Sequence, residues 1–127
     1  MDKYAALKQY FGHSEFRSGQ EALVDALLTG RDVLGIMPTG AGKSICYQLP
    51  ALLLPGVTLV ISPLISLMKD QVAALTQTGI PAAFINSSLS SEQQRDVFQR
   101  ARQGGYKLIY VTPERLSAPN FLRFAQE

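Results

Sequence analysis

The segment MPTGAGKS, residues 37–44, decides the fold that this sequence predicts. It lies between a short apolar run at residues 32–37 and a helix-like stretch at residues 43–54. Gly40 and Gly42 allow the chain to turn and bring backbone N–H groups close to the phosphates of a nucleotide. The amino terminus of the following helix adds unpaired donors and partial positive charge. The order of strand, loop and helix predicts a phosphate-binding loop at the carboxyl edge of an α/β sheet.

Two side chains at the end of this loop suit a nucleotide with its magnesium ion. Lys43 brings a full positive charge to the phosphates, and the Ser44 hydroxyl suits Mg²⁺, so we predict both as catalytic and Ser44 as the metal ligand. The loop residues expected to hold the nucleotide are Met37, Pro38, Thr39, Gly40, Ala41, Gly42, Lys43 and Ser44. The strict pattern G-x-x-x-x-G-K-[ST] would place glycine at Met37, so its first glycine is replaced. A loop that only caps a helix, with Lys43 in solvent, is the alternative that the flanking strand and helix disfavour.

Composition restricts the class of protein. The chain has 127 residues, enough for one ordinary domain with a core, and 46% hydrophobic against 17% charged residues is typical of a globular protein. No apolar run approaches the roughly 20 residues that span a bilayer, and residues 1–11 lack the apolar core of a signal peptide. The single cysteine, Cys46, cannot form an internal disulfide, and the sequence has no Cys/His cluster for a metal. A net charge of +2 neither requires nor excludes a nucleic-acid partner.

Apolar runs alternate with helical patterns along the chain. Strands are predicted at residues 32–37, 57–62, 82–86 and 107–111, and helices at residues 2–11, 18–30, 43–54, 64–78 and 90–104. The apolar runs at 32–37 and 57–62 are predicted to be buried strands. Strands separated by helices imply right-handed crossovers. We therefore predict an α/β fold with a mainly parallel sheet covered by helices on both faces.

Several helix boundaries have local signals. Asp2 is a candidate cap for the first helix, whose Tyr4, Leu7 and Phe11 fall on one face. The pairs Ser18–Glu21 and Ser90–Gln93 each have the spacing of a capping box. Pro50, inside the stretch at residues 43–54, should kink that helix or end its regular part because proline lacks the N–H donor.

Four segments resemble, in order and spacing, the motifs of RecQ-type DNA helicases of superfamily 2. They are FRSGQ at residues 16–20, MPTGAGKSICYQLPAL at 37–52, TLVISPLISLMKDQV at 58–72 and YVTPERL at 110–116. The resemblance implies a P-loop, RecA-like fold, ATP and Mg²⁺ as cofactors, single-stranded and duplex DNA as partners, and ATP-driven unwinding in recombination and repair. It also implies a location in the bacterial cytoplasm or nucleoid. A residue other than glycine at Met37 is the form that superfamily 2 helicases use.

The resemblance assigns recognition of the base to the segment before the P-loop. It implies that Gln20 hydrogen-bonds the adenine edge and that Arg17 packs on or near the base. An amide offers both a donor and an acceptor, and a guanidinium stacks on flat rings. The alternative is that Gln20 is an ordinary residue at a helix start and Arg17 a solvated flank. His13 could stack on the base, although a histidine in a polar turn is more often only exposed.

The resemblance also implies contacts to the DNA backbone after the second and fourth strands. Ser62, Ser66 and Lys69 belong to the segment that matches motif Ia, and hydroxyl groups and first-turn N–H groups are typical phosphate ligands. Thr112 and Arg115 belong to the segment that matches motif Ib. For Lys69 a solvated helix face is an equally good interpretation. Tyr106 and Tyr110 fit core packing better than base stacking.

The sequence contains no adjacent Asp-Glu pair, whereas the RecQ family supplies its Mg²⁺ carboxylate in a DExH motif. We therefore expect N-terminal helices with the adenine segment at residues 1–30 and a partial RecA-like domain at 31–127. This domain would be incomplete, without the DExH strand and later strands, as the N-terminal part of a larger helicase. A non-catalytic fragment that binds ATP or DNA without turnover is the alternative. A small P-loop kinase or GTPase-like switch is disfavoured because the sequence has no N-K-x-D motif.

Overall fold

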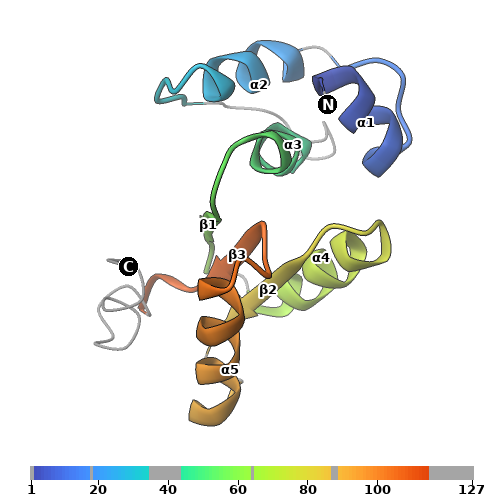
Figure 1. Ribbon diagram of the computed structural model, residues 1–127. Helices are drawn as coiled ribbons and strands as arrows, with labels where there is room; N and C mark the ends of the chain where they lie inside the picture. The colour runs from blue at the N-terminus through green and yellow to red at the C-terminus, as the bar shows by residue number, and fades with distance from the viewer. Residues whose placement is uncertain (1, 18, 35–43, 64, 87–88, 115–127) are drawn as a thin grey trace. The chain divides into compact units, whose positions relative to one another are not determined.

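The computed structural model describes residues 2–17, 19–34, 44–63, 65–86 and 89–114, and each structural statement concerns these ranges. The chain divides into two compact units, Met1–Pro55 and Gly56–Glu127. The first unit is helical, and the second contains the sheet (Figure 1). The domain boundary expected between residues 30 and 31 stays a prediction.

The first unit consists of α1 (Lys3–Phe11), α2 (Gln20–Leu28) and α3 (Ile45–Leu53). One apolar cluster joins the three helices. Its buried members are Ala6, Leu7, Val24 and Leu49, and the partly buried side chains around them are Tyr10, Phe11, Phe16, Leu28, Ile45 and Leu53. Removal of this apolar surface from water is the main favourable term that holds three short helices together.

The predicted cap of α1 is confirmed. The Asp2 carboxylate accepts a hydrogen bond from the backbone N–H of Ala5 at 2.7 Å, which satisfies one of the unpaired donors of the first turn. The helix ends at Gly12, whose φ of 73° is in the left-handed region that glycine adopts without strain. The predicted apolar face is only partly buried, because Leu7 is fully covered while Tyr4 is 50% exposed.

The N-cap predicted for α2 at Ser18 is wrong. Ser18 lies outside the described residues, but the N-cap of the helix is Gly19, and no side chain caps it within the described part of the chain. Glu21 instead directs its carboxylate to Lys3 and Tyr4 on α1. Lys3 and Tyr4 of α1 therefore bind the Glu21 carboxylate, which the local pattern had assigned to the cap of α2.

The strand predicted at residues 32–37 is not formed in its described part. Residues 32–34 have no strand structure, and Leu34 is 87% exposed. The described strands include no partner for this segment, and an apolar run cannot form a ladder without one. The next helix, α3, agrees with the prediction. Of the two effects predicted for Pro50, it does not end the helix, which continues to Leu53, and the kink stays a prediction.

The second unit contains β1 (Thr58–Ile61), α4 (Ile65–Gln77), β2 (Ala82–Ile85), α5 (Ser91–Arg102) and β3 (Leu108–Val111). The three strands are parallel in the order β1-β3-β2, so β3 is central. This arrangement confirms the predicted α/β class and the parallel sheet. The capping box predicted at Ser90–Gln93 is also confirmed, with both of its hydrogen bonds present.

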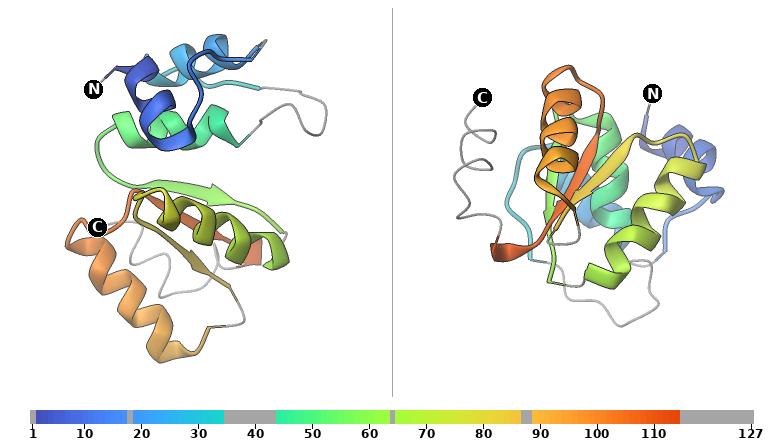
Figure 2. Two further views of the ribbon diagram at one scale, coloured as in Figure 1. Left: turned by 90° about the vertical axis from the view of Figure 1, so that its right-hand side faces the viewer. Right: turned by 90° about the horizontal axis from the view of Figure 1, so that it is seen from below.

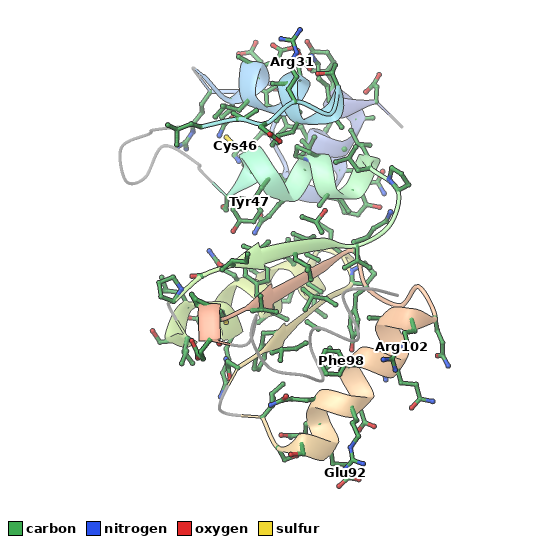
Figure 3. All side chains as sticks on the ribbon, turned by 90° about the vertical axis from the view of Figure 1, so that its left-hand side faces the viewer. Arg31, Cys46, Tyr47, Glu92, Phe98 and Arg102 are labelled. Carbon is green, nitrogen blue, oxygen red and sulfur yellow. The ribbon has the colours of Figure 1, made fainter. Side chains whose placement is uncertain are left out.

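Helices cover both faces of this sheet, as predicted. Strand β2 lies between α5 and α4 in the right-hand view of Figure 2. Phe98 and Ala101 of α5 form a core cluster with Ile85, Ile109 and Val111. Figure 3 shows Phe98 directed from α5 toward the strands and Glu92 directed away from them. The opposite face carries Tyr110, because its neighbours Ile109 and Val111 point to the α5 side.

Strand β1 was predicted to be buried, and this is wrong for one of its faces. Leu59 is 38% and Ile61 54% exposed, while the alternate residues Thr58 and Val60 are half-buried. Within the described sheet β1 pairs only with β3, and α5 packs against β2 at the other edge. The exposed face of β1 therefore lies outside the area that α5 covers.

Candidate functional site

The predicted nucleotide site is described only at its two ends. Arg17, Gln20 and Ser44 are described. The other predicted residues, which are Met37, Pro38, Thr39, Gly40, Ala41, Gly42 and Lys43, lie outside the described residues, as does Arg115 of the predicted DNA contacts. The structure therefore describes the start of the helix that follows the loop, and part of the segment that precedes the loop.

Ser44 is the N-cap of α3, and its backbone begins the helix. Its carbonyl oxygen accepts from the N–H groups of Gln48 at 2.9 Å and Tyr47 at 3.3 Å. The Ser44 hydroxyl makes no capping hydrogen bond in the described part of the chain, and the first turn of α3 contains no acidic residue. A hydroxyl that does not cap the helix, beside first-turn N–H groups and without a repelling carboxylate, suits a phosphate-bound Mg²⁺.

Gln20 is the first residue of α2 and is 2% exposed. The side-chain Oε1 of Gln20 accepts a hydrogen bond from the backbone N–H of Arg17 at 2.7 Å, and the backbone N–H of Gln20 donates to the Arg17 carbonyl at 3.0 Å. These two bonds close a turn that fixes the plane of the Gln20 amide. The side chain of Arg17 lies exposed beside it. The structure thus brings together the two residues that were predicted to recognise the base.

Charged groups link α1 to the start of α2. Lys3 Nζ lies 2.8 Å from Glu21 Oε2 and 2.6 Å from Asp25 Oδ1, and the Tyr4 hydroxyl donates to Glu21. Hydrogen bonds from Lys3 and then Tyr4 lower the pKa of Glu21. Hydrogen bonds from the Lys3 ammonium to Asp25 and then to Glu21 raise the pKa of Lys3. The hydrogen bond from the Tyr4 hydroxyl to Glu21 raises the pKa of Tyr4. All the shifts favour the protonation states in which the contacts form.

The predicted DNA contacts lie in part at one edge of the sheet. Residues Ile61, Val111 and Ile85 are aligned across the three strands, so Ser62, Thr112 and Asn86 follow them in one row at the carboxyl ends. The Ser62 N–H donates to the Val111 carbonyl at 2.9 Å and extends the ladder by one bond. The carboxyl edge of a parallel sheet is where ligands of α/β proteins usually bind.

The members of this predicted DNA surface differ in exposure. Ser66 and Lys69 are exposed on α4, and Ser62 is half-buried. Thr112 is 1% exposed, and its hydroxyl has no hydrogen-bond partner in the described structure. Ser66 and Lys69 are therefore accessible to a DNA strand, whereas Thr112 is held beneath the edge.

Other polar residues have simpler roles. His13 is exposed, in agreement with the plainer of its two interpretations. Cys46 is buried on the side of α3 that faces α2 (Figure 3), and burial raises the pKa of its thiol. The described residues contain no group of three or more His, Cys, Asp or Glu side chains that could hold a metal. None of the described helices is long and apolar enough to cross a membrane.

Two residues near the predicted sites were not singled out by their sequence context. Asn86 is fully buried, donates to Met68 Sδ at 3.7 Å, and completes the row of polar residues after the strands. A polar residue directly after a strand was the signal that could have indicated it. Tyr4 was assigned to an apolar helix face, and no local pattern indicated its contact with Glu21, which is 17 residues away.

Comparison with known proteins is consistent with the sequence motifs. The sequence model of the DEAD/DEAH box helicase family matches residues 17–126. The ATP-dependent DNA helicase RecQ of Bacillus subtilis is 52% identical over 121 residues, which are 94% of this chain and 20% of that protein. The RecQ helicase of Haemophilus influenzae is 52% identical over 119 residues, 94% of this chain and 19% of that protein.

One relative of lower identity and one solved structure are also helicases by name. The ATP-dependent DNA helicase Q-like 2 of Arabidopsis thaliana is 48% identical over 109 residues, 84% of this chain and 16% of that protein. The crystal structure of a hypothetical ATP-dependent RNA helicase from Sulfolobus tokodaii superposes with a TM-score of 0.71 at 21% identity, covering 96% of this chain and 37% of that one. At this identity the likeness concerns the fold. The chain spans about a fifth of the length of the first curated relatives it matches.

Proposed function

We propose that this chain, which belongs to the DEAD/DEAH box helicase family, supplies ATP-binding and DNA-binding segments of a RecQ-type ATP-dependent DNA helicase. The observation that carries the proposal is the 52% identity to a RecQ helicase over 94% of this chain. Its activity would be ATP-driven movement along single-stranded DNA that separates a duplex. Recombination and repair in the bacterial cytoplasm or nucleoid are the corresponding processes and location.

The proposed ATP site is the loop at residues 37–44, with the amino terminus of α3 behind it. Lys43 neutralises phosphate charge, and first-turn N–H groups of α3 donate to phosphate oxygens. Ser44 is the residue that would hold Mg²⁺, since its hydroxyl makes no capping bond in the described structure. Bound Mg²⁺ supplies positive charge to the phosphates and fixes their geometry.

The proposed base site is the turn formed by Arg17 and Gln20. The hydrogen bond from the Arg17 N–H to Gln20 Oε1 supports this assignment, because it orients the amide before any nucleotide arrives. An oriented amide distinguishes donors from acceptors on a base edge better than a freely rotating one. Arg17, exposed beside it, has a planar group that stacks on rings.

The proposed DNA contacts are Ser62, Ser66 and Lys69 around the first turn of α4, with Thr112 and Arg115 after β3. The exposure of Ser66 and Lys69 supports their role. Hydroxyl and ammonium groups hold a phosphate backbone without reading its sequence. The buried Thr112 would act by shaping the edge of the sheet on which the DNA strand lies.

Substitution of Lys43 tests the proposal in the protein that carries this sequence. Lys43→Ala should abolish ATP hydrolysis and unwinding, because the phosphates lose their cation, while most of the DNA affinity remains. The matched control is Lys8→Ala, which removes an exposed lysine on α1 and should change neither activity. Hydrolysis is measured by phosphate release, unwinding by strand separation of a labelled duplex and DNA affinity by fluorescence anisotropy. Unwinding that survives Lys43→Ala would refute the proposed ATP site.

A further inference from the structure

Tyr4 of α1 touches both flanks of the segment proposed to recognise the base. The two residues proposed to recognise the base, Arg17 and Gln20, lie between Phe16 and Glu21 in the sequence. Tyr4 meets Phe16 with its ring and Glu21 with its hydroxyl. One side chain from a separate helix therefore contacts the residue on each side of this segment.

The ring contact fixes the first end. The centroids of the Tyr4 and Phe16 rings are 5.8 Å apart with an interplanar angle of 58°, a tilted geometry that is favourable for aromatic pairs. Phe16 also packs against the apolar cluster of the first unit. Arg17 follows directly, so the position of Phe16 determines where the Arg17 backbone lies.

The hydroxyl contact fixes the second end. The Tyr4 hydroxyl donates to the Glu21 carboxylate, which also accepts from Lys3 at 2.8 Å. Lys3 in turn reaches Asp25 one helical turn further along α2 at 2.6 Å. Glu21 follows Gln20 directly, so these bonds hold the first turn of α2 and the residue whose amide is buried there.

We propose that Tyr4 is a positioning residue for base recognition, an inference that rests on the proposed ATP site. Between its two contacts, the bonds between Arg17 and Gln20 close the turn. A recognition segment that is held at both ends before binding loses less conformational freedom when the base arrives. Tyr4 acts through Phe16 and Glu21. Helix α1 thus holds in place the residues that would select the nucleotide.

The half-exposed position of Tyr4 makes the proposal testable. Tyr4 is 50% exposed and is not among the buried residues of the apolar cluster, so its replacement removes no buried residue of that core. Tyr4→Phe keeps the ring contact and removes the hydroxyl, whereas Tyr4→Ala removes both. The matched control is Tyr10→Phe, which deletes the same atom from another tyrosine of α1 that packs on the cluster.

The experiment measures binding of ATP and of inorganic triphosphate to the 127-residue chain by calorimetry. The wild-type chain should bind ATP more tightly than triphosphate, since only ATP reaches the base segment. Tyr4→Phe should weaken ATP binding about threefold, the scale of one modest hydrogen bond. Tyr4→Ala should weaken it about tenfold, because the aromatic contact is lost as well. Triphosphate binding should not change in either variant, and Tyr10→Phe should match the wild type.

The outcomes separate this inference from the function on which it rests. If the wild type prefers ATP and both Tyr4 variants keep that preference, Tyr4 has no positioning role and the ATP site stands. If Tyr4→Ala weakens triphosphate as much as ATP, the effect is a general loss of structure and the inference is wrong. A wild-type chain that binds both ligands equally would refute base recognition by this segment, and Tyr4's role with it. Binding of neither ligand would refute the ATP site.

Discussion

Gln20 shows at the scale of one residue how one hydrogen bond both satisfies and orients a buried polar side chain. A buried amide costs free energy unless its polar atoms are hydrogen-bonded. Gln20 is 2% exposed, and the Arg17 N–H satisfies its oxygen at 2.7 Å. The same bond restricts rotation of the amide. Satisfaction of the group and orientation of the group are therefore one feature of the fold.

Replacement of Gln20 should reduce discrimination between bases. Gln20→Ala removes the amide proposed to read the adenine edge, so the ratio of ATP to GTP affinity should fall about tenfold, the scale of one well-placed hydrogen bond. Competition between the two nucleotides for the chain measures this ratio. Gln9→Ala, which truncates an exposed glutamine on α1, is the control and should leave the ratio unchanged. An unchanged ratio in Gln20→Ala would remove the residue from base recognition.

Tyr4 shows what the spacing of residues cannot predict. Helical periodicity places Tyr4, Leu7 and Phe11 on one side of α1, and the structure buries Leu7 completely. Tyr4 lies at the margin of that side, where its contacts depend on which other segment of the chain packs against α1. Here that segment brings Phe16 and Glu21. Periodicity locates a face, but the partners of a marginal residue come from elsewhere in the chain.

The two predicted capping boxes make the same point at the scale of the element. Ser90–Gln93 and Ser18–Glu21 have identical spacing; the first box forms, whereas the N-cap of α2 is Gly19 and not Ser18. Gln93 is neutral and bonds the Ser90 N–H at 2.8 Å. Glu21 is charged, and Lys3 on α1 offers it a stronger, charge-assisted partner. A local pattern is reliable where no tertiary partner competes for its side chain.

Loss of the confirmed cap should destabilise the chain by a measurable amount. Ser90→Ala removes the oxygen that accepts from the Gln93 N–H at 3.1 Å and leaves a donor of the first turn of α5 unpaired. The free energy of unfolding should fall by about 1 kcal/mol, the usual cost of losing such a cap. Urea denaturation followed by circular dichroism measures it. Ser91→Ala, one residue further on, is the control and should have a smaller effect.

The edge strand shows a further limit at this scale. The apolar run at residues 57–62 correctly predicted β1 but not the exposure of Leu59 and Ile61. Residues 32–34 belong to another run predicted as a strand, at residues 32–37, and form no strand. Whether an apolar run becomes a strand, and which of its faces is covered, depends on neighbours that pair and pack with it. Composition of the run does not contain that information.

For the whole molecule, no carboxylate directly follows any of the three strands that the structure describes. The residues that directly follow the three described strands are Ser62, Asn86 and Thr112. Asp70 lies in α4 and Asp96 in α5. Hydrolysis requires a carboxylate that holds Mg²⁺ and a group that orients the attacking water. The sequence contains no adjacent Asp-Glu pair of the kind the RecQ motif supplies.

The 127-residue chain by itself should therefore bind ATP without turnover at a helicase-like rate. Phosphate release, measured with and without single-stranded DNA, should stay at the level of buffer while calorimetry detects bound ATP. Lys43→Ala is the control that should remove the binding. Turnover by the wild-type chain that disappears in Lys43→Ala would contradict this expectation and would require a different source for the missing carboxylate.

The sequence by itself determined the class of the fold and the order of the helices and strands that the structure describes, and it supplied the motif that defines the candidate site. These follow from local information, since periodicity, caps and the motif at residues 37–44 depend on neighbours along the chain. The tertiary structure decided that Glu21 bonds α1, that β1 is half exposed and that Ser62, Asn86 and Thr112 share one row. Those features depend on which distant segments meet. Packing sets such contacts, and no local pattern encodes them.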